Sequence, residues 1–334
     1  MIPAEMRAVG LNGAGGPEVL VPVTLPVPHP GAGQVLIRVQ AAGVNRPDIA
    51  QREGRYPVPA DASPIPGLEV AGRIAVLGDG VSDWAVGDAV CALVHGGGYA
   101  DYAVADAGTV LPVPEGLDMA MAAALPEVVL TVEVNMIQRA GLTSGETVLI
   151  HGGSSGIGSH AIERALAQGA TPIVTVGTEA KADWCRALGA ALAINYRTQD
   201  FEAEVRAFTQ GRGVDVVLDM VGGPYVARNL RSLALDGRYA LISLQGGRDV
   251  QASFEPVLRN RLTITGSTLR PLPPARKAVL TTEVRRTVWP MIAAGAIRPR
   301  LSHRFPLEQA ADAHRAMESP DHRGKIVLDV AADR

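Results

Sequence analysis

The chain has 334 residues, more than a single hydrophobic core usually supports, so two domains are expected. Hydrophobic residues make up 47% of the chain and charged residues 19%, which is typical of a folded globular protein and excludes a disordered one. The formal net charge of −3 gives no general attraction to nucleic acid or to an anionic membrane surface.

The first residues carry no recognisable targeting signal. MIPAEMRAVG lacks a basic region followed by an apolar core. The longest early uncharged run, residues 19–37, is interrupted by several prolines and glycines, which a membrane helix would not tolerate together. We therefore expect a cytoplasmic protein that does not bind a membrane.

The two cysteines do not form a recognisable site. Cys91 and Cys185 lie far apart and match neither a disulfide framework nor the spacing of a metal site. We expect each to be a small buried apolar side chain. The sequence predicts no metal ligands.

Up to about residue 120 the pattern is that of short strands and turns. Residues 34–40 alternate Val35, Ile37 and Val39 with polar or outward positions, and the runs 67–81 and 87–94 are bounded by Gly-Asp or Asp-Gly pairs. This predicts a compact, mostly β domain.

From about residue 120 the pattern of apolar residues changes, and segments typical of helices and strands alternate. Residues 117–142 are helical in composition and interrupted at Pro126. Six apolar strands separated by helical stretches predict an α/β domain with a doubly wound parallel sheet, whose ligand crevice lies at the carboxyl ends of the strands. The predicted strands are residues 147–151, 172–176, 191–195, 214–220, 238–243 and 262–266.

The first of these strands ends in a turn of small residues, VLIHGGSSGIGSH (148–160). Glycine allows a close approach to the backbone, and the first N–H groups of the following helix attract a phosphate. An ordinary strand–turn–helix connection would have a similar pattern, but the position after the first sheet strand favours a dinucleotide pyrophosphate. The predicted contacts are Gly153, Ser154, Ser155, Gly156 and Ile157.

The last part of the chain contains a long helical segment (275–295), a second helix (307–317) and a closing strand (324–330). These elements could extend the sheet domain or return to the first domain. Their spacing in the sequence leaves both alternatives open.

The whole chain resembles the medium-chain dehydrogenase/reductase superfamily, and within it the zinc-free, zeta-crystallin-like quinone oxidoreductases. The resemblance rests on motifs in the family's order: AAGVNRPDIAQREGRYP (41–57), PGLEVAGRI (66–74), VGDAVCAL (86–93), GGGYADY (96–102), VLIHGGSSGIG (148–158), LGAALAINYRTQDF (188–201), GVDVVLDMVGG (213–223) and GKIVLDV (324–330). It implies a GroES-like, mostly β catalytic domain (1–123 and 268–334) and a Rossmann dinucleotide-binding domain (124–267).

Zinc-dependent members of this superfamily have a cysteine and a histidine as metal ligands where this chain has Asn45 and Leu68. The lobe with four cysteines that binds structural zinc is also missing. Hydride transfer without a metal Lewis acid favours an acceptor that is already electrophilic. The resemblance therefore implies a quinone acceptor in the interdomain cleft.

The resemblance also implies the cofactor. An NAD site would have Asp or Glu at the end of the second sheet strand, where this chain has Gly177 and Thr178, with Lys181 one turn later. In similar enzymes the positions of Lys181 and Tyr196 surround the 2′-phosphate of NADPH. Glu179 lies close enough to oppose this interpretation, and without the family Lys181 and Tyr196 would be interpreted as ordinary surface side chains.

Further site residues follow from the resemblance alone. Asn45 and Tyr56 match polar residues at the mouth of the substrate cleft. Without the resemblance, Asn45 would be interpreted as a turn residue and Tyr56 as a side chain that packs on the surface. His151, at a strand end, is expected to be structural. The remaining positions matched to cofactor contacts are Thr131, Leu244, Gln245 and Lys325.

One departure concerns the acceptor. Similar enzymes carry aromatic residues after the LPE turn, whereas this chain has Val128–Leu130 and then Glu133. An aliphatic wall offers less stacking for a flat ring. An enoyl or α,β-unsaturated carbonyl reductase is therefore the alternative enzyme. An RNA-binding or crystallin-like structural protein is the alternative of another class, disfavoured by the slightly acidic charge.

The last predicted sheet strand, within RLTITGSTL (261–269), is rich in β-branched residues and would leave an exposed edge. In similar proteins this edge pairs with its two-fold mate. The sequence therefore predicts a homodimer with a continuous sheet.

Overall fold

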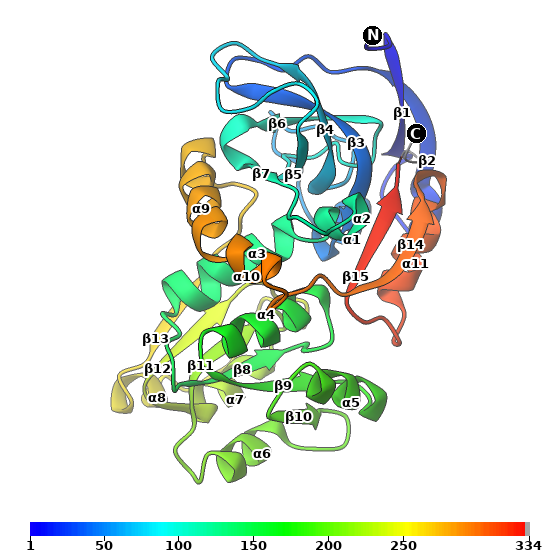
Figure 1. Ribbon diagram of the computed structural model, residues 1–334. Helices are drawn as coiled ribbons and strands as arrows, with labels where there is room; N and C mark the ends of the chain where they lie inside the picture. Colours follow the sequence, from blue (N-terminus) through cyan, green and yellow to red (C-terminus); the bar gives the residue numbers. More distant parts are fainter. Residues whose placement is uncertain (331–334) are drawn as a thin grey trace. The chain divides into compact units, whose positions relative to one another are not determined.

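The computed structural model describes residues 1–330, so residues 331–334 at the end of the predicted catalytic domain lie outside the described residues. The chain forms two compact units (Figure 1). The first contains Met1–Leu130, Arg270–Ala293 and the segment from Pro299 onward; the second contains Thr131–Leu269 and Ala294–Arg298. The domain limits given above stay a prediction.

The first unit is built on two sheets that are antiparallel except for the parallel pair β14 and β15. β1 (Glu5–Leu11) pairs with β2 (Leu20–Pro26), and a seven-stranded sheet has the order β14-β15-β3-β4-β5-β7, with β6 also paired to β3. The larger sheet consists of β3 (Gln34–Val44), β4 (Glu69–Leu77), β5 (Ala89–Leu93), β6 (Tyr102–Asp106), β7 (Val110–Pro112), β14 (Leu301–Pro306) and β15 (Lys325–Asp329).

Strand β3 is the centre of this sheet. Val35, Ile37 and Val39 are buried as the alternation predicts, but Leu36 is buried too. The reason is tertiary, because Leu36 packs into the same hydrophobic cluster as Val35, Ile37 and Val39, so both faces of β3 are covered. Only Arg38 is exposed in residues 35–39.

The C-terminal strand returns to the first unit. β15 runs antiparallel to β3, with Ile326 opposite Val44 and Asp329 opposite Ala41. This pairing decides the alternative that the sequence left open. The unit's helices are α1 (Arg46–Arg52), α2 (Met119–Ala123), the first residues of α3 (Pro126–Val132), α9 (Pro274–Thr287), α10 (Trp289–Ala293) and α11 (Ala310–Glu318), with short 3₁₀ turns η1 (Pro17–Val19), η2 (Ala107–Thr109) and η4 (Leu307–Gln309).

The predicted helix over 275–295 is divided into α9 and α10 near Val288. Pro290 explains the division, because it has no N–H to donate and disfavours helical backbone at the residue before it. None of the helices described in residues 1–330 is long and apolar enough to cross a membrane.

The second unit contains a six-stranded parallel sheet of order β10-β9-β8-β11-β12-β13 (Figure 1). This is the doubly wound order in which the chain reverses direction beside the first strand. Its strands are β8 (Thr147–His151), β9 (Thr171–Val176), β10 (Leu192–Asn195), β11 (Val214–Asp219), β12 (Leu233–Leu241) and β13 (Thr263–Gly266). The predicted fold class is confirmed.

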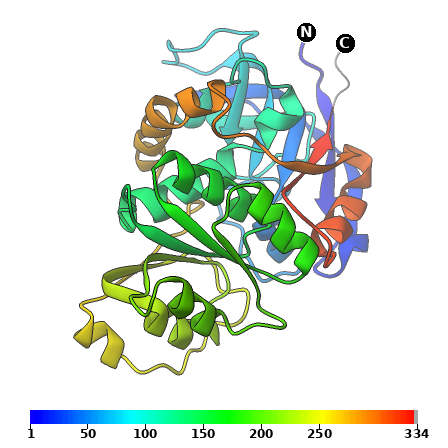
Figure 2. The same ribbon diagram turned by 60° about the horizontal axis from the view of Figure 1, so that its bottom comes forward.

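Two hydrophobic clusters cover the two faces of this sheet. Val148 and Ile150 of β8 pack with α4 (Gly156–Ala167), α5 (Glu179–Ala187) and the π-helix η3 (Glu133–Arg139). Leu149, between them, packs with α6 (Phe201–Phe208) and α7 (Tyr225–Ser232). The two-residue period of the strand thus supplies one side chain to each layer. Figure 2 shows α4 as a green helix lying along the sheet.

β13 forms one edge of the sheet, with Thr263 and Gly266 exposed and Ile264 39% exposed. The short helix α8 (Glu255–Arg259) precedes it and presents the exposed side chains Phe254 and Leu258. β12 begins at Leu233, earlier than predicted, and its register with β11 shifts between Val214 and Val216.

Candidate functional site

The glycine turn follows β8 and leads directly into α4. Gly152 has φ +67°, and Ser155 is the N-cap of α4, its hydroxyl accepting from Gly158 N at 3.0 Å. Ser154 is buried. The turn therefore places the first backbone N–H groups of a twelve-residue helix at the carboxyl end of β8, where an anion is favoured.

Two of the glycines are required by packing. A Cβ on Gly153 would lie 2.5 Å from Val174 Cβ of β9, and one on Gly158 would lie 2.3 Å from Gly152 O. Both distances are shorter than side chains allow. These glycines bring helix and strand together, and they leave the turn's backbone without side chains that would cover it.

His151 is a structural residue. Its Nδ1 pairs with Thr175 Oγ1 at 2.9 Å and its Nε2 with Asn229 Oδ1 at 2.7 Å, and the ring is fully buried. Burial lowers its pKa, so the ring is neutral. Both nitrogens are satisfied within the fold, as expected of a histidine at a strand end.

The second strand, β9, ends at Gly177 and Thr178. Thr178 is the N-cap of α5, its hydroxyl accepting from Lys181 N at 3.3 Å, and this places Lys181 in the first turn. Glu179, which the sequence left as a competing charge, accepts from Asn195 Nδ2 at 3.0 Å and lies 3.9 Å from Arg186. Its carboxylate is thus turned to partners within the fold.

Tyr196 follows β10 and meets the end of β9. A Cβ on Gly177 would lie 2.9 Å from the Tyr196 hydroxyl and 3.6 Å from Arg197 Nε. The structure therefore brings Gly177, Tyr196 and Arg197 together, with Tyr196 42% exposed. Arg197 was missed in the sequence, although it directly follows Tyr196, and it adds a cation at the end of β9.

Leu244 and Gln245 lie in the loop after β12. Gln245 N donates to Met220 O at 3.3 Å, and Gly246 N donates to Val221 O at 2.7 Å, so this loop is tied to the end of β11. Leu244 is 42% exposed. All predicted cofactor contacts of this unit except Thr131, in α3, follow the carboxyl ends of β8, β9, β10 and β12, where an open parallel sheet binds its ligand.

In the first unit, Glu69 is the centre of a buried polar network. Its Oε1 accepts from Asn45 Nδ2 at 2.9 Å and from Lys325 Nζ at 2.5 Å, and its Oε2 accepts from Glu127 N at 2.8 Å. Glu69 is fully buried. One carboxylate therefore joins β4, the N-terminus of α1, β15 and the first turn of α3.

Lys325 and Asn45 are both engaged within this network. The Lys325 ammonium also donates to Asn45 Oδ1 at 2.6 Å and Val44 O at 3.2 Å, so its three protons all have acceptors in the protein. Asn45 keeps one amide hydrogen for a further contact. The network thus surrounds Asn45 with a lysine–carboxylate ion pair, which sequence spacing could not reveal.

Asp48 extends this network into the core. It accepts from Asn45 N at 2.8 Å and Gly67 N at 3.0 Å, and the Tyr99 hydroxyl lies 3.4 Å from it and 3.0 Å from His314 Nε2. Burial raises the pKa of Asp48 to about 6 and lowers that of His314 to about 3. This arm is a structural connection between α1 and α11.

Tyr56, the second predicted catalytic residue, is half-buried. The Arg270 guanidinium lies 5.5 Å from the centre of its ring, a cation–π distance. Burial, and after it the neighbouring Glu127, raises the pKa of the Tyr56 hydroxyl, which is therefore a hydrogen-bond donor at neutral pH. Tyr56 thus presents a phenol beside charged neighbours.

Glu127 is the residue that the sequence analysis overlooked in this unit. The backbone N–H of Glu127 donates to the Glu69 carboxylate. The Glu127 carboxyl group itself makes no hydrogen bond to residues 1–330. Burial, and then the charge of Glu69, raises its pKa to about 8. It is a largely protonated carboxylic acid at neutral pH, a property that only its tertiary neighbours reveal.

Glu133 does not belong to an acceptor wall. It lies in η3, where its carboxylate pairs with Arg164 Nε of α4, both side chains being almost fully buried. Val128, Val129 and Leu130 of α3 are buried as well. The charge that stood out in the sequence is therefore part of an internal ion pair within the second unit.

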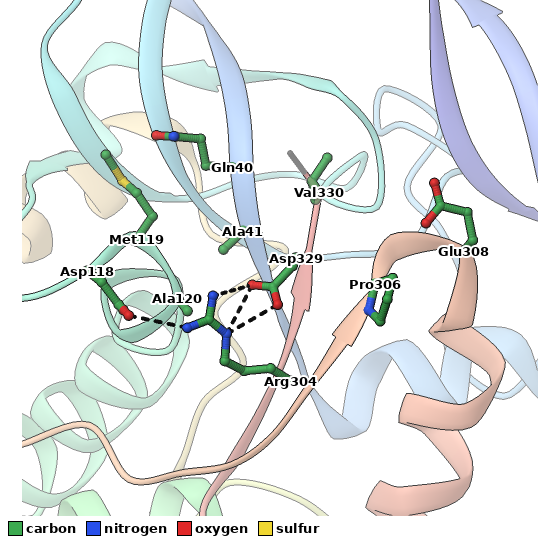
Figure 3. Close-up of a pocket in the computed structure, with 10 residues that line it drawn as sticks. All are labelled: Gln40, Ala41, Asp118, Met119, Ala120, Arg304, Pro306, Glu308, Asp329 and Val330. Carbon is green, nitrogen blue, oxygen red and sulfur yellow. Dashed lines mark hydrogen bonds and ion pairs between the residues drawn. The ribbon is translucent and has the colours of Figure 1, made fainter. Parts of the chain in front are cut away.

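A cavity of about 410 Å³ in the first unit lies away from these residues. Figure 3 shows Arg304 within it, its guanidinium directed to Asp329 and Asp118. Glu308, also on its wall, pairs with Arg7. Its charges are thus neutralised within the protein, and it includes none of the predicted site residues. Within residues 1–330, no group of three or more metal-ligating side chains occurs.

Two family models match the chain. The alcohol dehydrogenase GroES-like domain matches residues 31–115, and the zinc-binding dehydrogenase model matches residues 188–328. Together they include most of the strands of both units.

Solved structures agree over the full length. An NAD-dependent alcohol dehydrogenase is 30% identical, with a TM-score of 0.85 over 98% of this chain and 100% of that one. The Escherichia coli quinone oxidoreductase in complex with NADPH is 28% identical, with a TM-score of 0.88 over 97% of this chain and 100% of that one.

Among curated relatives, a phthioceranic/hydroxyphthioceranic acid synthase of Mycobacterium tuberculosis is 34% identical over 90% of this chain. The chain spans only 14% of the length of that relative.

Proposed function

Because the chain belongs to the medium-chain dehydrogenase/reductase superfamily, of the zinc-free quinone-oxidoreductase type, we propose that it is an NADPH-dependent quinone oxidoreductase. Oxidoreduction is the activity of the family. The cofactor and the acceptor are our proposal. The glycine turn after β8, with the N-cap Ser155 and a backbone free of side chains, is the observation that carries it.

The residues of the second unit fit the cofactor. Gly153, Ser154, Ser155, Gly156 and Ile157 would hold the pyrophosphate through the turn and the N-terminus of α4. The 2′-phosphate would meet Gly177, Thr178, Lys181 and Tyr196, to which the structure adds Arg197. We further assign Thr131 to the nicotinamide end and Leu244 and Gln245 to other cofactor contacts. Lys325, predicted as a cofactor contact, has all its ammonium protons engaged within the protein and would act only by holding Asn45 and Glu69. NADPH supplies the hydride when it is bound.

The first unit would hold the acceptor. The remaining amide hydrogen of Asn45 and the hydroxyl of Tyr56 orient the carbonyl oxygen, and Tyr56 or a water molecule returns the proton. Neither Asn45 nor Leu68 is a zinc ligand, so no metal polarises the carbonyl from these positions. An acceptor that is electrophilic by itself, such as a quinone, matches this arrangement.

The test compares turnover of 1,2-naphthoquinone, 1,4-benzoquinone and a simple enone with NADPH. We expect kcat/KM to be highest for one of the quinones. Reduction of the enone alone would overturn the quinone assignment while preserving the reductase. A lack of turnover with all three, in a folded preparation that binds NADPH, would overturn both.

The second candidate is an enoyl or α,β-unsaturated carbonyl reductase. It is favoured by the aliphatic residues at the start of α3 and by the similarity to a phthioceranic/hydroxyphthioceranic acid synthase. The same hydride chemistry would then reduce a conjugated double bond. The comparison of acceptors above separates the two candidates.

We also propose a homodimer formed through β13. The exposed edge, with Ile264 and the neighbouring Leu258 in solvent, supports pairing with a second copy. Light scattering at micromolar concentration should give the mass of two chains. Ile264→Lys should give that of one, and a monomeric mass for the unchanged chain would contradict the proposal.

A further inference from the structure

Two buried cations lie near each other in the first unit, and one of them, Arg270, lies over the ring of Tyr56. Arg270 is 5% exposed and Lys277, in α9, is 8% exposed. The Lys277 ammonium donates to Arg270 O at 2.9 Å, which ties the two residues together. We call Arg270, Lys277 and Tyr56 the cationic cluster.

Neither cation has a carboxylate partner at ion-pair distance in the described part of the chain. Arg270 Nη1 donates to the uncharged Gln51 Oε1 at 2.9 Å and Nη2 donates to His95 O at 3.3 Å, while its buried Nε has no hydrogen-bond partner. The other cations that are comparably buried, Lys325, Arg164 and Arg52, do have such partners. The cationic cluster is therefore the exception in this fold.

The nearest acidic groups do not compensate for these charges. Glu127 acts on both cations, but burial raises its pKa to about 8 and leaves it largely neutral at pH 7. Asp48 also acts on Arg270, while Asp106 and Asp61 act on Lys277, all from beyond ion-pair distance. Burial lowers the pKa of both Arg270 and Lys277, as expected for cations that lack a counter-charge.

Burying a charge without a counter-charge is costly, so a fold that keeps two such residues joined by a hydrogen bond has a reason to do so. We propose that the cationic cluster binds an anionic group, a carboxylate, sulfonate or phosphate, carried by the acceptor that is reduced. The half-buried Tyr56 is its most exposed member. This assignment to the acceptor rests on the proposed function, in which Tyr56 faces the acceptor's carbonyl.

Binding is tested first, because it needs no turnover. The probe is naphthalene-1-sulfonate, with 1-naphthol as its uncharged counterpart, titrated against the full chain by calorimetry. We expect the sulfonate to bind at least about tenfold more tightly, a difference of ~1.4 kcal/mol. Lys277→Met should abolish this preference and Lys277→Arg should retain it.

Arg276→Gln is the matched control, since Arg276 is the exposed neighbour of Lys277 on the same helix. It removes the same formal charge and should leave the preference for the sulfonate intact. An equal loss in Arg276→Gln would show that net charge alone attracts the probe and would overturn the proposal. Equal binding of both probes to the unchanged chain would overturn it too.

Turnover then identifies the source of the anionic group. 1,2-Naphthoquinone-4-sulfonate should be reduced with a kcat/KM about tenfold above that of 1,2-naphthoquinone, mainly through KM, and Lys277→Met should remove the difference. If Lys277→Met instead raises the KM of NADPH, or if inorganic sulfate alone competes with NADPH at this cluster, the group belongs to the cofactor and the proposal is wrong.

The two proposals can fail separately. Preferential, Lys277-dependent binding of naphthalene-1-sulfonate in a chain that reduces no quinone or enone would support the anion site and overturn the proposed function. Efficient reduction of neutral quinones with no preference for the sulfonate would do the reverse.

Discussion

The candidate cofactor residues of the second unit (the cofactor half) and the candidate acceptor residues of the first unit (the acceptor half) are arranged by different means. In the second unit the site consists of backbone turns and exposed side chains that follow the ends of neighbouring strands, such as Gly153, Gly177 and Tyr196. In the first unit the candidate residues belong to a network of buried polar groups from four separate elements, joined through Glu69. The cofactor half should therefore tolerate substitution with losses of affinity, whereas the acceptor half should lose stability.

The largest effect is expected for Glu69→Gln, which tests whether the acceptor half depends on its buried ion pair for stability. It leaves the Lys325 ammonium buried without a counter-charge, which costs about 3–5 kcal/mol when one member of a buried pair is removed. Urea denaturation should show this loss, and Lys325→Met in the same chain should recover part of it. Glu308→Gln, which removes an exposed ion pair with Arg7, is the control and should cost about 1 kcal/mol or less.

A loss below about 1 kcal/mol in Glu69→Gln would show that water or neighbouring groups compensate for the Lys325 charge. The two halves would then not differ in how strongly their substitutions reduce stability.

The second prediction concerns the cofactor half. A hydrogen bond to a charged group contributes about 1.5–3 kcal/mol, and exposure reduces this value, so NADPH should be preferred over NADH by at least about tenfold in kcat/KM. Lys181→Ala and Arg197→Ala should each reduce the preference for NADPH over NADH, mainly by raising the KM of NADPH. Neither substitution should change the stability of the chain much.

Arg186→Ala in the same helix, α5, is the matched control, because Arg186 pairs with Asp183 and Glu179 and is not among the proposed cofactor contacts. Equal efficiency with both cofactors, or unchanged discrimination in Lys181→Ala, would refute the assignment of the end of β9.

The third prediction concerns the pH dependence of the free energy of unfolding. The pKa of Glu127 is raised from 4.5 to about 8, so between these pH values the folded chain keeps a proton that the unfolded chain releases. The free energy of unfolding must therefore fall as the pH rises through this window and level off above it. Glu127→Gln, which is neutral at every pH, should gain roughly 1 kcal/mol or more relative to the unchanged chain between pH 5 and pH 9.

Denaturant titrations at the two pH values measure this difference, with Glu115→Gln at an exposed position as the control. A pH-independent difference for Glu127→Gln would mean that Glu127 is ionised in the folded state.

The smallest effect is expected on chelation. Since Asn45 and Leu68 are not zinc ligands, elemental analysis should find no stoichiometric zinc, and incubation with a chelator should leave reductase activity unchanged. Loss of activity that added zinc restores would contradict the metal-independent mechanism proposed for the acceptor half.

The sequence by itself determined the family, the parallel sheet and the glycine turn. These features depend on local patterns: the apolar strands, the helix that starts after Ser155, and the side chains that Gly153 and Gly158 must lack. A site made from turns at the ends of consecutive strands leaves such a pattern, because its parts lie close to their strands in the chain. Arg197 escaped notice only because its proximity to Gly177 depends on how β10 meets β9.

Only the tertiary structure decided which residues meet in the acceptor half. Lys325 is 256 residues from Glu69, and nothing in either local sequence specifies that they meet; the pairing of β15 with β3 does so. The same holds for Glu127, whose raised pKa reflects burial beside Glu69, and for Glu133, whose apolar neighbours in the sequence gave no sign of its partner Arg164. Buried charges depend on partners brought by distant elements, because the energy of a charge is set by what surrounds it in space.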